Sequence, residues 1–164
     1  MAGESSVDKI LPCLLMRLTD ESPTQQKESL DNKFISLRRY KESVVRDIEY
    51  LLNSHSPFNH QELMGLAEVE KSVLNYGLHD LCGVNISSAA IGDIEASIKQ
   101  TLLTFEPRII KNSLTVRAVT DYRPYCDQTI SFKIEAQIWA QPSPEYLLVK
   151  TEIDVETGRC SLKD

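Results

Sequence analysis

One stretch of the chain alternates apolar and polar residues without a break: Ile130-Ser131-Phe132-Lys133-Ile134-Glu135-Ala136-Gln137-Ile138. Successive side chains of a β-strand point to opposite faces, so the pattern predicts a strand with one buried and one polar face. The same alternation occurs on both sides of this stretch. It is carried by Leu114, Val116 and Ala118 before it, and by Leu147, Val149, Thr151, Ile153 and Val155 after it.

Turn-forming residues separate these predicted strands. Pro124 and Asp127 lie between the first and second, Pro142 and Pro144 lie between the second and third, and Glu156-Thr157-Gly158 leads to a short last strand with Cys160 and Leu162. Connections this short favour an antiparallel meander. We expect the strand around Glu145 to Val155 to offer an open edge to which an extended segment of another protein can add.

Upstream of the strands the apolar period changes from two residues to that of an α-helix. One helix is predicted over 33–53, with Asp31 or Asn32 as its N-cap and an apolar face of Phe34, Leu37, Tyr40, Val44, Ile48 and Leu51. A second is predicted over 88–105, with Ile91, Ile94, Ile98, Leu102 and Phe105 on one face, and it ends before Pro107. Residues 54–86 carry turn formers and predict short helical turns and loops rather than a sheet.

The predicted fold class is α+β, with an N-terminal arm and helices followed by a small antiparallel β-meander that has helices packed on one face. Residues 1–31 form the predicted docking arm and linker, and 32–164 form the domain. Within the arm, Leu11, Leu14, Leu15 and Leu18 recur at helical spacing. One or two helical turns cannot bury such a stripe alone, so the arm docks either on its own domain or on a partner.

Charged residues follow the polar side of the first predicted helix. Ile35, Arg39, Glu42, Arg46 and Glu49 form a stripe opposite the apolar face, with Glu42 four residues before Arg46. Such a stripe is typical of a solvated, ion-paired surface. The alternative is that Lys33, Arg38, Arg39, Lys41 and Arg46 form a basic patch for an acidic protein partner.

Composition excludes several classes of function. The 164 residues carry 18 Lys and Arg against 24 Asp and Glu, and this net charge of -6 argues against a general binder of nucleic acid or anionic membranes. The longest apolar run, Ile10 to Met16, contains Pro12 and predicts neither a signal peptide nor a membrane-spanning helix. We therefore expect a cytoplasmic protein with reduced cysteines.

Catalytic and metal-binding patterns are weak in this sequence. His55, His60, His79 and Cys82 could be drawn as a zinc site, but they lack the two tight ligand pairs that structural zinc sites usually show. Phosphate-binding glycine loops and nucleophile elbows do not occur. Glu145 and Asp154 have a spacing seen in phage-type lysozymes, yet a strand would hold them ~30 Å apart, whereas glycosidase carboxylates lie ~5–9.5 Å apart. We expect no catalytic residues, metal, cofactor or small-molecule substrate.

A charged corner follows the second predicted helix at Glu106-Pro107-Arg108. A carboxylate just past a helix C-terminus faces the negative end of the helix dipole, which is unfavourable. Arg108 is the nearest cation in the sequence that can pair with this carboxylate. The corner is either a helix stop with a local ion pair or a preset charged lock for another subunit.

Taken together, several runs of this sequence resemble one protein family. They are Leu37-Arg38-Arg39-Tyr40-Lys41-Glu42-Ser43-Val44-Val45-Arg46-Asp47-Ile48-Glu49-Tyr50-Leu51-Leu52-Asn53, Ser72-Val73-Leu74-Asn75-Tyr76-Gly77, Phe105-Glu106-Pro107-Arg108 and, in the arm, Leu14-Leu15-Met16-Arg17-Leu18-Thr19-Asp20-Glu21-Ser22-Pro23. In this order they are similar to the TssE baseplate subunits of bacterial type VI secretion systems, within the phage-tail baseplate wedge family.

The resemblance implies a structural part of a contractile injection machine, assembled in the cytoplasm at the inner face of the inner membrane. Its implied partners are the wedge subunits TssF, TssG and TssK and the sheath proteins TssB and TssC. Glu106, Pro107 and Arg108 would be assembly residues. Leu14, Leu15, Arg17, Leu18, Arg39 and Arg46 are further candidate interaction residues. The family has also carried a lysozyme-like label, so peptidoglycan hydrolysis is the alternative function.

Overall fold

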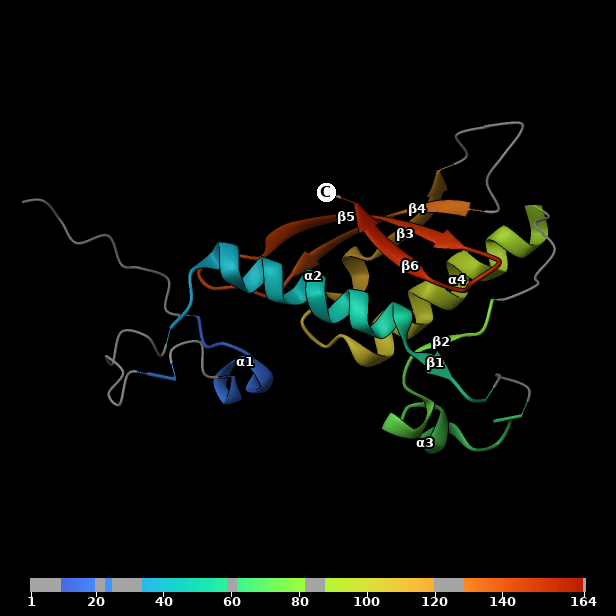
Figure 1. The fold of residues 1–164 in the computed structure, drawn as a ribbon, viewed down its shortest axis with the longest axis horizontal. Helices are drawn as coiled ribbons and strands as arrows, with labels where there is room; N and C mark the ends of the chain where they lie inside the picture. Colours follow the sequence, from blue (N-terminus) through green and yellow to red (C-terminus); the bar gives the residue numbers. More distant parts are fainter. Residues whose placement is uncertain are drawn as a thin grey trace, which may run out of the picture.

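The computed structural model describes residues 10–19, 23–24, 34–58, 62–81, 88–119 and 129–163. Its centre is a four-stranded sheet of β3 (Thr115–Val119), β4 (Thr129–Ile138), β5 (Glu145–Asp154) and β6 (Cys160–Lys163). Each strand pairs antiparallel with the next in the order β3-β4-β5-β6 (Figure 1). The predicted meander is confirmed.

One face of the sheet forms the core together with two long helices. Along β4 the apolar residues Ile130, Phe132, Ile134, Ala136 and Ile138 are buried. The helices α2 (Leu37–Asn53) and α4 (Ser88–Phe105) lie on this face, α4 against β3 and α2 against β6 (Figure 1). The α+β class with helices on one face is confirmed.

The prediction that β5 is an open edge strand is only half right. Residues Lys150 to Ile153 pair with β6, so this part of β5 lies inside the sheet. Among the described residues, none forms a strand on the same side of Glu145 to Val149. On this side of the sheet, the edge is therefore formed by the first half of β5 and by the outer side of β6.

Helix α2 begins later than the sequence predicts, and Asp31 and Asn32 are not its N-cap. Ser36 is the N-cap, and its side-chain oxygen accepts a hydrogen bond from the Arg39 N–H at 3.4 Å. Ile35, assigned to the polar stripe, is buried and pairs in an antiparallel bridge with Ile10. The bridge requires extended backbone at Ile35, which a helix starting at residue 33 cannot supply.

Helix α4 has the predicted bounds, and Ile94, Ile98 and Leu102 on its predicted face are buried. The Glu106 N–H still donates to the Leu102 carbonyl at 3.0 Å, after which Pro107 turns the chain away. A short 3-10 helix, η3 (Lys111–Ser113), then leads into β3.

The segment between the long helices contains more regular structure than expected. Besides α3 (Ala67–Glu70) and the 3-10 helix η2 (Val73–Asn75), it has two short strands, β1 (His55–Ser56) and β2 (Leu78–His79), which pair in parallel. The expectation of no sheet here is thus wrong. Gly77 permits the pairing because its φ is +120° and a Cβ there would lie 2.2 Å from the Ser54 carbonyl oxygen.

The described part of the N-terminal arm contains one short helix, α1 (Leu14–Leu18), in which no residue is fully buried. Ile10, just before it, is buried beside Ile35. In the described ranges no helix combines the length and apolar character needed to span a membrane.

Candidate protein interaction site

Glu106 and Arg108 of the charged corner form a partly buried ionic network that also includes Asp47 of α2. Arg108 donates through Nε and Nη2 to the two Glu106 oxygens at 2.6 and 2.5 Å, and Nη2 also reaches Asp47 Oδ2 at 2.7 Å. The Arg108 backbone N–H adds a bond to Glu106 at 3.1 Å. The Glu106 side chain is 5% exposed, and those of Arg108 and Asp47 are 20% and 24% exposed.

This arrangement ties three elements together. Glu106 lies at the end of α4, Asp47 lies in the middle of α2, and the Arg108 carbonyl accepts from the Trp139 N–H just past β4 at 2.8 Å. Burial lowers the pKa of Arg108, but hydrogen bonds and charge interactions with Glu106 and Asp47 outweigh it and raise the pKa above its usual value. These contacts thus favour the charged form of Arg108.

Two tyrosines adjoin the network. Burial raises the pKa of Tyr40, with further effects from Arg108 and Glu106, and its hydroxyl donates to the Trp139 carbonyl at 2.8 Å. Burial also raises the pKa of Tyr76, whose ring lies edge-on to Phe105 with centroids 5.3 Å apart. The predicted ion pair between Glu106 and Arg108 therefore exists, but Asp47 gave no signal in the sequence because it is one of many polar residues on α2.

The candidate residues of the arm lie apart from this corner. Leu14, Leu15 and Leu18 are 68%, 56% and 74% exposed, and Arg17 is exposed as well. The arm therefore docks on its own domain through Ile10, while its leucine stripe faces solvent. Docking on its own domain is thus seen at Ile10, while docking of the leucine stripe on a partner stays a prediction.

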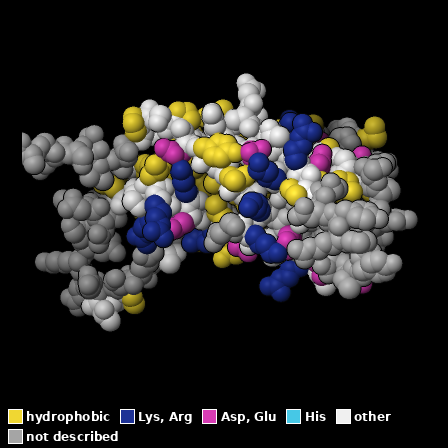
Figure 2. Space-filling view, turned by 90° about the horizontal axis from the view of Figure 1, so that it is seen from above, with side chains coloured by type: hydrophobic (Ala, Val, Ile, Leu, Met, Phe, Trp, Pro, Cys, Tyr) yellow, Lys and Arg dark blue, Asp and Glu magenta, His cyan; other side chains and the backbone are white. Residues whose placement is uncertain are grey.

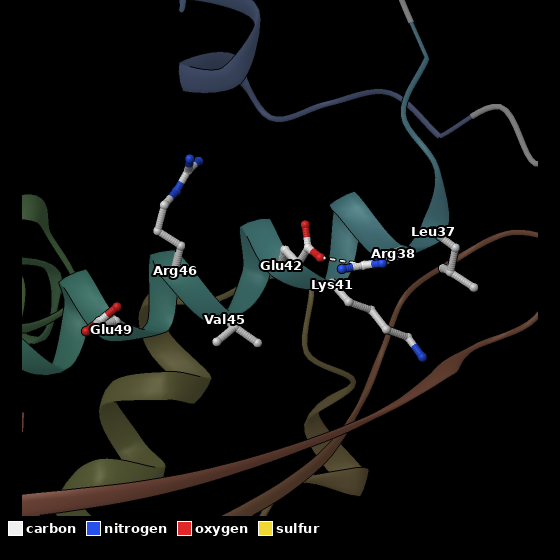
Figure 3. A pocket seen from close by; sticks show the side chains of 7 residues that line it. All are labelled: Leu37, Arg38, Lys41, Glu42, Val45, Arg46 and Glu49. Atoms are coloured by element: carbon white, nitrogen blue, oxygen red, sulfur yellow. Dashed lines mark hydrogen bonds and ion pairs between the residues drawn. The ribbon is translucent and has the colours of Figure 1, made fainter. Parts of the chain in front are cut away.

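Arg39 and Arg46 are exposed residues of α2. Glu42 pairs with Arg38 at 2.8 Å, and Arg46 lies 3.7 Å from Asp47 Oδ1, so the expected pairing of Glu42 with Arg46 is replaced by these contacts. A groove of about 510 Å³ runs along this part of the helix, with Leu37 and Val45 as its apolar residues (Figure 3). Its rim is charged, with Arg38, Lys41, Glu42, Arg46 and Glu49.

The ridge of α2 that includes Leu37, Lys41, Val45 and Glu49 lies along the side of the sheet where β5 is half open. Near one end, Lys41 pairs with Glu145 at the start of β5 at 2.7 Å. At the other, the Asn53 amide group donates to the Cys160 carbonyl at 2.9 Å and accepts from the Cys160 N–H at 3.0 Å. Asn53 thus occupies the backbone groups of β6 at Cys160, whereas the first half of β5 has no such cover from the described residues.

The hydrogen-bond pattern shows which groups of β5 point outward. The Asp154 N–H donates to the Arg159 carbonyl on the β6 side. Backbone groups of a strand alternate in direction, so Glu152 and Lys150 face the same side, and so do Leu148 and Tyr146 beyond the end of β6. Among the described residues, no strand pairs with the outward N–H and C=O groups of Leu148 and Tyr146, so these groups offer a place for a further strand.

Among the described residues, those considered for catalysis or metal binding lie apart from one another or bind other groups. Glu145 and Asp154 lie at opposite ends of β5, where Glu145 binds Lys41 and Asp154 accepts from the Glu156 N–H at 2.8 Å. In the described part of the chain, no group of three or more His, Cys, Asp or Glu residues could hold a metal ion. His60 and Cys82 lie outside the described residues, and His55 and His79 are exposed.

A family profile described as "Baseplate wedge protein gp25" matches residues 38–143, which run from the first turn of α2 past the end of β4 and include the charged corner. The chain belongs to the baseplate wedge protein gp25 family. The match covers most of the helical face and half of the sheet. Membership of the wedge family gives the protein a structural role in a phage-tail-like baseplate.

Comparison with solved structures gives a more distant likeness. A crystal structure named a putative tail lysozyme from Geobacter sulfurreducens is 19% identical, with a TM-score of 0.47 over 71% of this chain and 91% of that one. No curated protein matches the chain. The wedge family assignment therefore rests on the family profile.

Proposed function

We propose that this wedge protein is the TssE-type baseplate subunit of a type VI secretion machine. In this role it joins the wedge subunits TssF, TssG and TssK and starts the sheath of TssB and TssC, in the cytoplasm at the inner face of the inner membrane. The observation that carries the proposal is the match of residues 38–143 to the baseplate wedge family. The ordered TssE-like runs in α2, in the segment before β2 and at the charged corner support the secretion assignment.

Sheath initiation is assigned to the open half of β5. An extended arm of the first sheath ring adds there as a new strand, with the outward groups of Tyr146 and Leu148 forming its backbone hydrogen bonds. The α2 ridge with Leu37 and Val45 lies beside this edge and offers apolar contacts for alternate side chains of the arm. A strand that starts a polymer in this way must imitate the edge that one sheath subunit offers to the next.

A proline substitution tests this assignment. Leu148→Pro removes an outward N–H, so the ladder to β4 is kept while the new strand loses a hydrogen bond. We expect a folded protein that still captures TssF and TssG but supports few sheaths, counted by fluorescence microscopy of labelled TssB. Val149→Pro is the matched control, since its N–H faces β4 and its loss should unfold the sheet. Normal sheath numbers with Leu148→Pro would refute strand addition at this edge.

The protein carries out this role without catalysis. A retaining or inverting glycosidase needs two carboxyl groups that lie ~5–9.5 Å from each other, whereas the pair with lysozyme-like spacing spans the whole of β5. The purified protein should release no more dye from labelled peptidoglycan than buffer does. Release that is lost on replacing one Asp or Glu would favour the hydrolase instead.

A further inference from the structure

The outer face of the sheet carries a row of four basic residues, one from each strand. Register places Arg117 of β3 opposite Lys133 of β4, Lys133 opposite Lys150 of β5, and Lys150 opposite Lys163 of β6. Figure 2 looks down on the molecule from above and shows Lys and Arg side chains in a line across it, with hydrophobic side chains alongside. With strands about 4.8 Å apart, the row is roughly 14 Å long.

Such a row opposes the stability of the sheet. Like charges directly opposite each other on neighbouring strands repel, and here three successive pairs do so. Two of the four cations form ion pairs. Lys133 pairs with Glu135 at 3.0 Å, and Lys163 pairs with Glu152 at 2.6 Å. Within the described part of the chain, Arg117 and Lys150 have no ion-pair partner. Among the described residues, the two cations without an ion pair are thus Arg117 and Lys150, which lie two strands apart in a protein whose net charge is -6.

We propose that this basic row is a docking surface for an acidic α-helix of a protein partner that lies across the strands. The spacing selects a helix. Residues three or four apart on a helix advance ~4.5–6 Å, close to one strand spacing, and residues seven apart advance ~10.5 Å, close to the ~9.6 Å between Arg117 and Lys150. In an extended segment, side chains on one face lie ~6.7 Å apart, and this spacing does not match the ~4.8 Å between neighbouring cations of the row.

The surroundings of the row favour a helix over other anions. Glu135 and Glu152 flank it on either side, so a broad anionic surface or a nucleic acid backbone meets repulsion there, whereas a single stripe of carboxylates does not. Tyr146 and Leu148, which are 55% and 44% exposed, precede Lys150 on the same face of β5. They suit a helix whose acidic stripe borders an apolar one.

This surface is the face of the sheet, whereas the proposed function uses the β5 edge, so the two can be tested separately. The probe is a synthetic helical peptide with Glu at positions i, i+3, i+7 and i+10, titrated calorimetrically into the full-length protein at low ionic strength. A peptide of the same composition with the Glu residues spread around the helix is the control ligand. We expect the striped peptide to bind roughly tenfold more tightly than the control peptide, because only its Glu residues can form ion pairs with Arg117 and Lys150 at the same time.

The protein variants are charge-matched. Arg117→Glu with Lys150→Glu should weaken binding of the striped peptide roughly tenfold or more, while Lys99→Glu with Lys111→Glu, the same change in net charge at exposed sites elsewhere, should change it less than about threefold. Melting curves establish that both variants are folded. Equal losses in the two variants, equal binding of the two peptides, or tighter binding to duplex DNA or phosphatidylserine vesicles than to the striped peptide would overturn the proposal.

Discussion

At the C-terminus of α4, Glu106 lies where the helix dipole disfavours a carboxylate by ~0.3–1 kcal/mol. Arg108 more than offsets this cost, because it binds both Glu106 oxygens and is itself shared with Asp47. The corner is therefore a tertiary link between α4 and α2 as well as a helix stop. Its role as a contact for other subunits stays a prediction.

Replacing Glu106 tests the internal role of the corner. Glu106→Ala leaves the guanidinium of Arg108 largely buried with Asp47 as its remaining partner, so we expect a loss of about 3 kcal/mol in the free energy of unfolding. Asp47→Asn, which keeps the Glu106 pair, should cost less, about 1 kcal/mol. Urea denaturation measures both. An unchanged midpoint for Glu106→Ala, combined with failed baseplate assembly, would assign the residue to a partner instead.

A second residue gives a pH-dependent prediction. Burial raises the pKa of the Cys160 thiol from 9.0 to about 11. The unfolded chain loses this proton near pH 9 while the folded chain keeps it, so stability is fully present below pH 9 and falls as pH rises toward 11. Relative to Cys160→Ala, the wild-type protein should lose about 1 kcal/mol between pH 8 and 10. Parallel curves for the two proteins over that range in thermal melts would contradict the buried, neutral thiol.

Among the secondary structure elements, β5 differs between its two halves in how many neighbouring strands it pairs with. Its second half is held between β4 and β6, while its first half has an open side next to the α2 ridge. Asn53 at the end of α2 covers the adjacent backbone groups of β6. The unprotected length of edge is thus short, which limits indiscriminate pairing between copies of the protein.

Lys150 sits in β5 between Lys133 and Lys163, so its charge repels both neighbours. Lys150→Gln keeps the first part of the aliphatic side chain and removes the charge, and we expect the melting temperature to rise by about 1–3 °C. The same substitution should weaken binding of the striped acidic peptide. Lys99→Gln on α4 is the matched control and should do neither. A lower melting temperature for Lys150→Gln would show that the row is not under electrostatic strain.

For the molecule as a whole, the described part of the N-terminal arm contacts the core through buried Ile10 and partly buried Met16, and it exposes a leucine stripe. Ile10 is 8% exposed and contacts Ile35, so the arm contributes directly to the core. The original division into an arm at 1–31 and a domain at 32–164 stays a prediction about independent folding.

Substitutions in the arm separate its two parts. Leu14→Ser with Leu18→Ser should leave the free energy of unfolding within about 0.5 kcal/mol, because both side chains are already exposed, yet weaken capture of TssF and TssG. Ile10→Ala should cost about 2–3 kcal/mol through lost burial. Chemical denaturation and pull-down with purified wedge proteins measure the two effects. A large loss of stability in the double Leu variant would place the stripe in the domain's own core.

The sequence alone determined the two long helices, the four strands of the meander and their order, but not β1 and β2. Unbroken alternation in β4 and β5 and the apolar face of α4 specify strands and a helix locally, because burial on one face imposes the period of each element. It also predicted the pairing of Glu106 with Arg108, since two residues on either side of a proline are close in any conformation.

Only the tertiary structure decided which groups from distant segments meet. The start of α2 shifted to Leu37 because Ile35 pairs with Ile10. Asp47 joined the charged corner from 61 residues away, and the basic row arose from the register of four strands. Register and long-range packing depend on the whole core at once, so no local pattern in the sequence records them.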